Sequence, residues 1–179
     1  MINTLLFNQI MDGIDKAIYE SLSDDKITIS NHKFTTEEII KICKKYDFKL
    51  FIDNFKKNDN SFPYINPDNV KYIVAVSGSD ICGILAYGNS KDIQDRWKAY
   101  EDNKHTRFAH IFDLETLPEY RGKGIATLLI KKAIERIKQS GNKGVTLQGI
   151  NRKTAKMYHD KFGFDVYKDQ ESPLMELMF

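Results

Sequence analysis

The chain has 179 residues, of which 41% are hydrophobic and 29% are charged, and its formal net charge is +2. This length and apolar content are enough for one compact domain, residues 1–179, with a sizeable core. The small net charge gives no strong field that would indicate a nucleic acid or a membrane as partner. No run of 18 apolar residues occurs, which excludes a transmembrane helix.

Two further features indicate a cytoplasmic protein. The two cysteines, Cys43 and Cys82, lack metal-ligand spacing and are expected to be free thiols in a reducing compartment. The N-terminal apolar pattern contains Asp12 and Asp15 and has no basic lead-in, which is not typical of a signal peptide. We therefore expect a cytoplasmic location and no metal site.

The N-terminal third is predicted to be mainly helical. Apolar residues at helical spacing predict a helix over residues 2–18, and alternation predicts a short strand over residues 26–30. Thr35 and Glu38 form a capping box, which opens a second helix. After a break at Asp47, another helical stripe of aromatic and aliphatic residues follows.

The central part is predicted to be a β-hairpin between two polar segments. Residues 56–69 are polar and are predicted to form a loop. Two apolar runs, over residues 72–76 and 81–87, are joined by a turn sequence that contains Gly78. Residues 89–107 are polar and are expected to form a short helix or an excursion.

The C-terminal half alternates between strands and helices without repeats or a linker. The predicted elements are, in order, a strand over residues 108–117, a helix from residue 125 to about residue 140, a strand over residues 145–150, a helix over residues 153–161, and strands over residues 164–167 and 173–179.

The most informative segment is the turn between the first of these strands and the helix that follows it. The first N–H groups of a helix have no intrahelical partner, and the helix dipole adds positive charge at that end. Gly122 and Gly124 allow a ligand to approach the backbone closely. Arg121 and Lys123 add two full positive charges. The segment therefore predicts a site for a phosphate or a pyrophosphate.

Three families of proteins have a phosphate-binding loop of this general kind. A P-loop requires G-x-x-x-x-G-K-[ST], but Lys123 is followed by Gly124, and no glycine stands five residues upstream. A Rossmann loop requires a third glycine where this chain has Thr127. The third pattern, Arg-x-x-Gly-x-Ala from Arg121 to Ala126, resembles the coenzyme A pyrophosphate loop of the GNAT family of N-acetyltransferases.

A second motif downstream resembles the same family. Asn151 is followed seven residues later by Tyr158 on a predicted helix, and then by Gly163 and Phe164. Gly163 lies five residues after Tyr158, where the family usually has four. The sequence therefore does not determine the residue at which this helix ends. The resemblance covers roughly residues 73–179, and the first 70 residues match no pattern.

The resemblance implies an α/β fold of three layers, in which a twisted, mostly antiparallel sheet is flanked by helices. Residues 71–179 would form the acetyl-CoA-binding core, and residues 1–70 a helical part that shapes the acceptor site. The implied activity is transfer of an acetyl group from acetyl-CoA to a primary amine. The residues implied in cofactor binding are Thr116, Leu117, Arg121, Gly122, Lys123, Gly124, Ile125, Ala126, Thr127, Asn151 and Tyr158.

Three residues are implied in catalysis. The Tyr158 hydroxyl would protonate the leaving thiolate, and the backbone N–H of about Leu114 would stabilise the oxyanion. His110 occupies the position of the general base in several family members, and an imidazole pKa near 6.5 suits that role. A strand histidine that a neighbouring side chain satisfies is the alternative interpretation of His110.

Alternation along the strand places His110 on one face together with Phe112, Leu114 and Thr116. Asp113 and Glu115 then lie on the other face. These two carboxylates are reserve candidates for the base, and they are expected to be solvated or paired with the helix that packs there.

A second functional class stays open, a non-catalytic acyl-CoA-binding or protein-interaction module. Nucleic-acid binding is not indicated, because the basic residues are scattered. The sequence does not identify the acceptor, which could be a small amine, an antibiotic, a protein N-terminus, a lysine side chain of a protein or peptide, or an aminoacyl-tRNA. Edge strands in the C-terminal half are compatible with a homodimer.

Overall fold

The computed structural model describes residues 27–57, 69–89 and 107–179. The helix expected over residues 2–18 lies outside the described residues, and so does most of both polar segments. Within the described ranges, no helix combines the length and the apolar character needed to cross a membrane.

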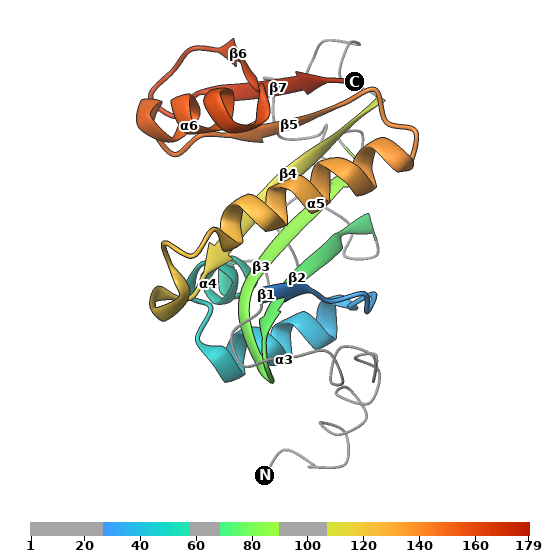
Figure 1. Cartoon of the computed structure of the whole chain (residues 1–179), viewed down its shortest axis with the longest axis vertical. Coiled ribbons are helices and arrows are strands. Elements are labelled where there is room, and N and C mark those ends of the chain that lie inside the picture. Colours follow the sequence, from blue (N-terminus) through green and yellow to red (C-terminus); the bar gives the residue numbers. More distant parts are fainter. Residues whose placement is uncertain (1–26, 58–68, 90–106) are drawn as a thin grey trace.

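The described residues form one seven-stranded sheet in the order β1-β2-β3-β4-β5-β7-β6 (Figure 1). All neighbouring strands are antiparallel except β4 and β5, which are parallel. This confirms the expected mixed and mostly antiparallel sheet. The strands are β1 (Ile27–Ile29), β2 (Lys71–Ser77), β3 (Asp80–Asn89), β4 (Phe108–Thr116), β5 (Gly144–Gln148), β6 (Asp165–Lys168) and β7 (Leu174–Met178).

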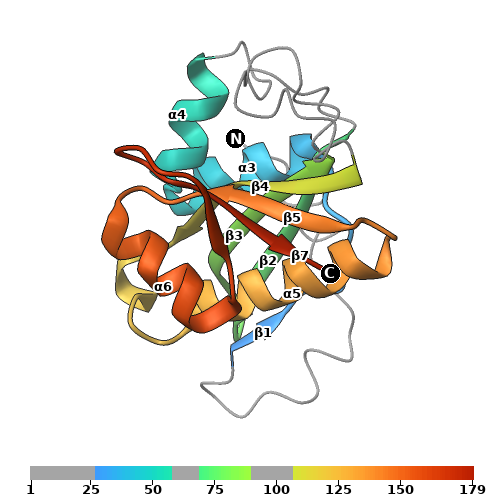
Figure 2. The same cartoon turned by 90° about the horizontal axis from the view of Figure 1, so that it is seen from above.

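Helices cover both faces of the sheet. Helices α3 (Thr36–Tyr46) and α4 (Lys49–Lys57) lie on one face, and α5 (Ile125–Gln139) and α6 (Arg152–Phe162) lie on the other (Figure 2). Two apolar cores result, one beneath α3 and α4 and one beneath α5. Because β2 and β3 contribute to both cores, their sequences are nearly continuous apolar runs rather than alternating ones.

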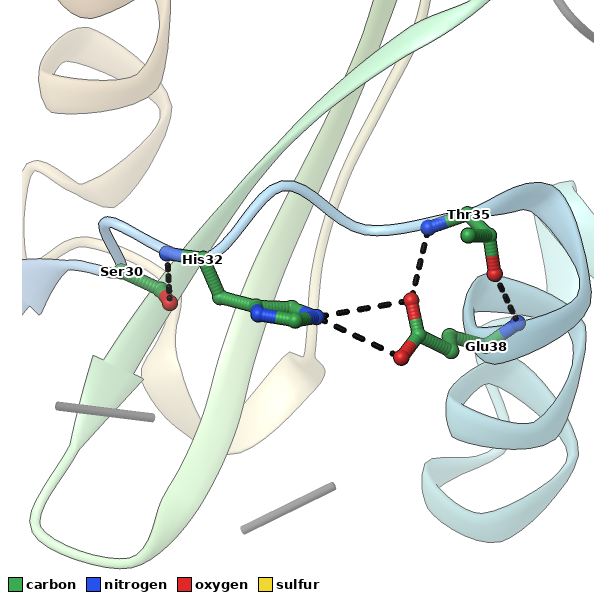
Figure 3. Close-up of polar contacts among 4 residues, drawn as sticks. All are labelled: Ser30, His32, Thr35 and Glu38. Carbon is green, nitrogen blue, oxygen red and sulfur yellow. Dashed lines mark hydrogen bonds and ion pairs between the residues drawn. The ribbon is translucent and has the colours of Figure 1, made fainter. Parts of the chain in front are cut away.

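The start of α3 follows directly from the sequence. The Thr35 hydroxyl accepts a hydrogen bond from the Glu38 N–H at 3.2 Å, and the Glu38 carboxylate accepts one from the Thr35 N–H at 2.7 Å (Figure 3). The His32 ring also contacts this carboxylate, with Nε2 at 3.3 Å. Helix α3 ends at Asp47 in the left-handed conformation, φ +58°, so the predicted capping box and the predicted break are both confirmed.

Helix α4 obtains its N-terminal cap from a distant strand. The Glu115 carboxylate on β4 accepts hydrogen bonds from the N–H groups of Leu50 and Phe51, at 3.0 and 3.4 Å. This confirms the expectation that Glu115 pairs with the helix that packs there. The contact also holds α4 beside the end of β4.

A glycine on β3 sets how closely α5 approaches the sheet. A Cβ at Gly83 would lie 2.8 Å from Ile125 Cγ2 and 3.1 Å from Leu129 Cδ1, which is too close. The start of α5 therefore packs directly on β3. Both cysteines are buried and free, as expected from the sequence.

Candidate active site

Strands β4 and β5 pair at their beginnings and then part, which leaves one edge of β4 facing a gap (Figure 1). Pairing ends at His110 and Thr146, while β4 continues to Thr116. The gap therefore lies beside residues 111–116, the part of β4 that carries most of the predicted site residues.

A β-bulge divides β4 into two parts. Asp113 pairs with Ala86, whereas Ile111 pairs with Tyr87, so Phe112 is an extra residue on β4. A bulge shifts the residues beyond it by one position and so exchanges the faces to which they point.

The expected alternation along β4 is therefore wrong. Leu114 and Thr116 lie on the α5 face of the sheet, as their partners on β3 show. His110 lies instead on the α3 and α4 face, together with Asp113 and Glu115.

His110 is buried at the last rung that joins β4 to β5. Its exposed fraction is 4%, and its Nδ1 lies 2.9 Å from the Thr146 hydroxyl oxygen. That hydroxyl donates a hydrogen bond to the Ala109 carbonyl at 3.3 Å, so Nδ1 carries the proton in the His110–Thr146 contact. Burial lowers the pKa of His110 to about 3. This geometry matches the alternative interpretation, a strand histidine that a neighbouring side chain satisfies.

The main chain of β4 presents donors to the gap. The Leu117 N–H donates to the Cys82 carbonyl of β3 at 3.1 Å. Because successive residues of a strand point their main-chain groups to opposite edges, the N–H groups of Leu114 and Thr116 point away from β3. They therefore face the gap between β4 and β5.

The glycine-rich turn forms a cavity of about 320 Å³ at the start of α5, which we call the loop cavity. Gly122 and Gly124 have φ values of +79° and +82°, a conformation that glycine adopts without strain. The cavity is lined by Thr116, Tyr120, Arg121, Gly122, Gly124, Ile125, Ala126, Thr127, Ile130, Met157 and Lys161.

The loop cavity offers main-chain hydrogen-bond donors for which the described part of the chain shows no helical acceptor. The first helical bond of α5 joins the Leu128 N–H to the Gly124 carbonyl, and the N-cap residue, Gly124, supplies no side-chain cap. The three preceding N–H groups, from Ile125 to Thr127, therefore lack a helical acceptor. Among the described residues, the buried Thr116 hydroxyl has no hydrogen-bond partner either. The free N–H groups at the start of α5, with the cationic side chains of Arg121 and Lys161, fit an anionic ligand such as a diphosphate.

A second cavity, of about 430 Å³, lies in the gap itself, and we call it the gap cavity. It reaches residues of both sheet faces, since Leu50 comes from α4 and Tyr158 from α6. The lining consists of Leu50, Ile111, Phe112, Asp113, Leu114, Leu147, Gln148, Gly149, Ile150, Tyr158 and Ser172.

Tyr158 lines the gap cavity from α6. Its ring packs near Phe162 and Phe164, with centroids 6.3 and 6.1 Å away. Burial raises the pKa of Tyr158, so its hydroxyl stays protonated at neutral pH and can act as a proton donor.

Three residues implied in cofactor binding line neither cavity. Leu117 is buried in the core beneath α3 and α4. The Lys123 ammonium lies 5.1 Å from the centre of the Tyr120 ring. The Asn151 side chain caps α6 by accepting a hydrogen bond from the Thr154 N–H at 2.9 Å. Their implied contacts with the cofactor stay predictions.

The end of α6, which the sequence left open, is a glycine cap. Helix α6 runs to Phe162 and ends at Gly163 with φ +77°. The additional residue after Tyr158 thus extends the helix and does not change the spacing from Asn151 to Tyr158. The sequence motifs do not include Met157 and Lys161, although both line the loop cavity and their spacing on α6 places them on one helix face.

The described residues contain no candidate metal site. Within residues 27–57, 69–89 and 107–179, no group of three or more histidine, cysteine, aspartate and glutamate side chains is arranged to hold a metal ion.

Solved structures with the same fold include several acetyltransferases. The PaiA N-acetyltransferase of Thermoplasma acidophilum, solved with coenzyme A, has a TM-score of 0.55 at 17% identity, over 86% of this chain and 99% of that one. The IAA acetyltransferase of Bacillus cereus has a TM-score of 0.56 at 15% identity, over 84% and 97%. AtaTR bound with acetyl-CoA has a TM-score of 0.60 at 13% identity, over 87% and 94%. At these identities the likeness concerns the fold.

The amino-acid sequence shows the family to which the chain belongs. No curated protein sequence matches the chain significantly. A sequence model of the acetyltransferase (GNAT) family, however, matches residues 19–164, which is most of the chain and includes both motifs. The chain belongs to the GNAT family of acetyltransferases.

Proposed function

We propose that this protein binds acetyl-CoA and transfers its acetyl group directly to a primary amine. One observation carries the proposal, namely that the loop cavity and the gap cavity follow one another along β4. Thr116 lines the first and Leu114 the second, about 7 Å apart at the rise of an extended strand. A diphosphate at the start of α5 would thus direct an attached acyl thioester along β4 into the gap. Coenzyme A or acetyl-CoA in the related structures supports this assignment.

Different residues of the chain would bind different parts of the cofactor. The N–H groups of residues 125–127 and the Arg121 guanidinium would hold the diphosphate. The N–H groups of Leu114 and Thr116 would bond to the acyl-carrying arm as a neighbouring strand does, and the Leu114 N–H would stabilise the oxyanion. The cofactor itself supplies the activated acetyl group.

For the proton on the amine, we propose Asp113 as the acceptor in place of His110. Asp113 lines the gap cavity, whereas His110 does not. In the proposed step, a C–N bond forms and the C–S bond breaks. One proton passes from the amine to the Asp113 carboxylate, and another passes from Tyr158 to the leaving thiolate.

The test combines calorimetric binding of acetyl-CoA with a thiol-release assay. Replacing the phenol in Tyr158→Phe should lower kcat by about 10²- to 10⁴-fold, because it removes the proton donor to the sulfur. The affinity for acetyl-CoA should change little. Tyr167→Phe, on β6 and outside both cavities, is the matched control. An unchanged kcat in Tyr158→Phe would remove Tyr158 from the proposed role.

The same assay decides between the proposed enzyme and the binding module that the sequence left open. Binding of acetyl-CoA without release of thiol on any amine would support the non-catalytic module. Absence of binding at millimolar acetyl-CoA would contradict both. The cytoplasmic location and the homodimer stay predictions; the buried free thiols agree with the former, and the exposed Val166 on β6 with the latter.

A further inference from the structure

A cavity of about 450 Å³ lies beside the beginning of β2, and we call it the edge cavity. Strand β1 pairs with β2 only over residues 75–77, and beyond this pairing the Ser30 N–H donates to the Val74 carbonyl at 2.9 Å. The chain then leaves β2 and continues to α3, and the cavity lies where the two segments part. The lining consists of Asn31, Lys33, Phe34, Val70, Lys71, Tyr72, Tyr87, Arg136 and Gln139.

The edge cavity is separate from the two cavities of the proposed acetyl transfer. It shares no lining residue with either of them. Arg136 and Gln139 belong to the last turn of α5, whereas the loop cavity lies at the first turn of the same helix. A helix of 15 residues is about 22 Å long. A ligand in the edge cavity would therefore not compete with the cofactor.

Buried apolar side chains form the inner wall of the edge cavity. Phe34, Val70 and Tyr72 belong to the core beneath α3 and α4. Tyr87 belongs to the core beneath α5. Because both cores hold this wall, its shape exists before any ligand binds. A preformed wall of aromatic and aliphatic side chains, in a cavity of this volume, is typical of sites for small organic molecules.

Three cationic side chains, those of Lys33, Lys71 and Arg136, line the same cavity, and its described lining contains no acidic side chain. Within the described part of the chain, neither lysine pairs with an acidic side chain. Glu135, the neighbour of Arg136 in the sequence, lies outside the lining and pairs with Lys132 at 2.8 Å. The positive charge at the cavity therefore favours an anionic ligand.

The guanidinium of Arg136 is held at the wall by contacts with the protein. It donates hydrogen bonds to the Tyr87 hydroxyl and, at 3.5 Å, to the Ser30 carbonyl. A guanidinium has five N–H donors in a fixed plane, which is more than these two contacts use. Its geometry matches a carboxylate, which accepts two parallel hydrogen bonds from it.

We infer that the edge cavity binds a small organic carboxylate with an apolar body, as a ligand additional to acetyl-CoA and the amine. The carboxylate lies among Lys33, Lys71 and Arg136. The apolar body packs against Phe34 and Tyr72. This inference does not depend on the proposed acetyl transfer. A neutral ligand would leave the three cations without a counter-charge, and an anion without an apolar body would leave the wall uncovered.

Titration of the isotope-labelled full-length protein with benzoate, followed by amide chemical shifts, tests the inference. Saturable shift changes should centre on residues 31–34, 70–72 and 136–139. Benzamide lacks the charge and acetate lacks the ring, so each should bind about tenfold or more weakly than benzoate. Absence of saturable changes at millimolar benzoate, or changes confined to residues 116–127, would overturn the inference. Equal affinity for benzamide, or tighter binding of inorganic phosphate, would also overturn it.

A double variant tests the cationic side of the cavity. Lys33→Gln combined with Lys71→Gln should lower the affinity for benzoate about tenfold or more, because it removes two of the three charges. Thermal unfolding should be unchanged, since both side chains are exposed. Lys131→Gln is the matched control, because Lys131 is exposed on α5 and lies outside this lining. It should bind benzoate as the wild type does. Wild-type affinity in the double variant would overturn the inference, whatever the acetyl-transfer assay shows.

Discussion

At the scale of single residues, His110 lies at the point where β4 and β5 separate. Its Nδ1–H bonds to the Thr146 hydroxyl, which in turn bonds to the Ala109 carbonyl. Both side chains are almost completely buried. The pair therefore joins the two strands at their last rung, immediately before the gap that would hold the thioester. We interpret His110 as a positioning residue.

Replacing His110 with asparagine tests this interpretation through the dependence of stability on pH. Burial lowers the pKa of His110 to about 3, so the unfolded chain takes up a proton near pH 6.5 and the folded chain does not. The stabilising contribution of neutral His110 is complete above pH 6.5 and is lost as the pH falls below it. Relative to His110→Asn, the free energy of unfolding of the wild type should fall by about 2 kcal/mol between pH 7 and pH 5.

Asparagine retains a donor near the position of Nδ1 and does not titrate. Chemical denaturation at both pH values gives the stability difference, and parallel profiles would contradict the assigned burial. The same variant separates the two interpretations of His110, because a lost general base lowers kcat by about 10²-fold or more. A positioning role predicts a smaller decrease in kcat.

The sequence predicted much of the site at this scale because the residues of the loop cavity are nearly contiguous. Glycines, cations and a helix start within one short segment specify an anion site locally. The orientation of β4 could not be predicted in the same way. A period of two assumes a regular strand, whereas the bulge at Phe112 depends on the register with β3. His110 was therefore expected on the wrong face relative to Leu114.

At the scale of elements, the N-termini of the neighbouring helices α3 and α4 are capped in different ways. Helix α3 has its cap within its own sequence, at Thr35 and Glu38, and this cap was predicted. Helix α4 has no acidic residue in its first turn, and its cap is Glu115, 65 positions away from Leu50. A cap that comes from another element leaves no local pattern, so the sequence predicted the helix but not what stabilises its start.

Substitution of Glu115 should therefore weaken α4 specifically. Glu115→Ala should lower the free energy of unfolding by about 1 to 2 kcal/mol, since it removes the acceptor for two helix N–H groups. Glu115→Gln keeps an acceptor oxygen and should lower the free energy of unfolding less.

Because α4 carries Leu50, KM for the amine should increase in Glu115→Ala while KM for acetyl-CoA stays constant. Equal stability of the two variants would contradict the capping role, and an equal rise in both KM values would contradict the position of α4 at the acceptor side.

At the scale of the whole molecule, the sheet consists of two parts with a limited connection. Strands β1 to β4 form one part, and β5, β7 and β6 form the other. Their strands meet over three residue pairs, from Phe108 to His110 on β4. Helix α5 connects the two parts in the chain and packs mainly on β2, β3 and β4 (Figure 1). Beyond His110, no described strand lies between the facing edges of β4 and β5.

Acetyl-CoA bound as proposed would therefore connect the two parts of the sheet. Hydrogen exchange followed by mass spectrometry should show slower exchange in acetyl-CoA at three places: the loop at residues 121–127, the edge of β4 at residues 111–117, and the facing segment at residues 146–150. Bound ligand lowers the population of locally opened states, and exchange reports that population. Protection confined to residues 121–127 would contradict the placement of the acyl arm in the gap. Adenosine 3′,5′-bisphosphate, which lacks that arm, should protect the loop alone and leave the two strand edges unchanged.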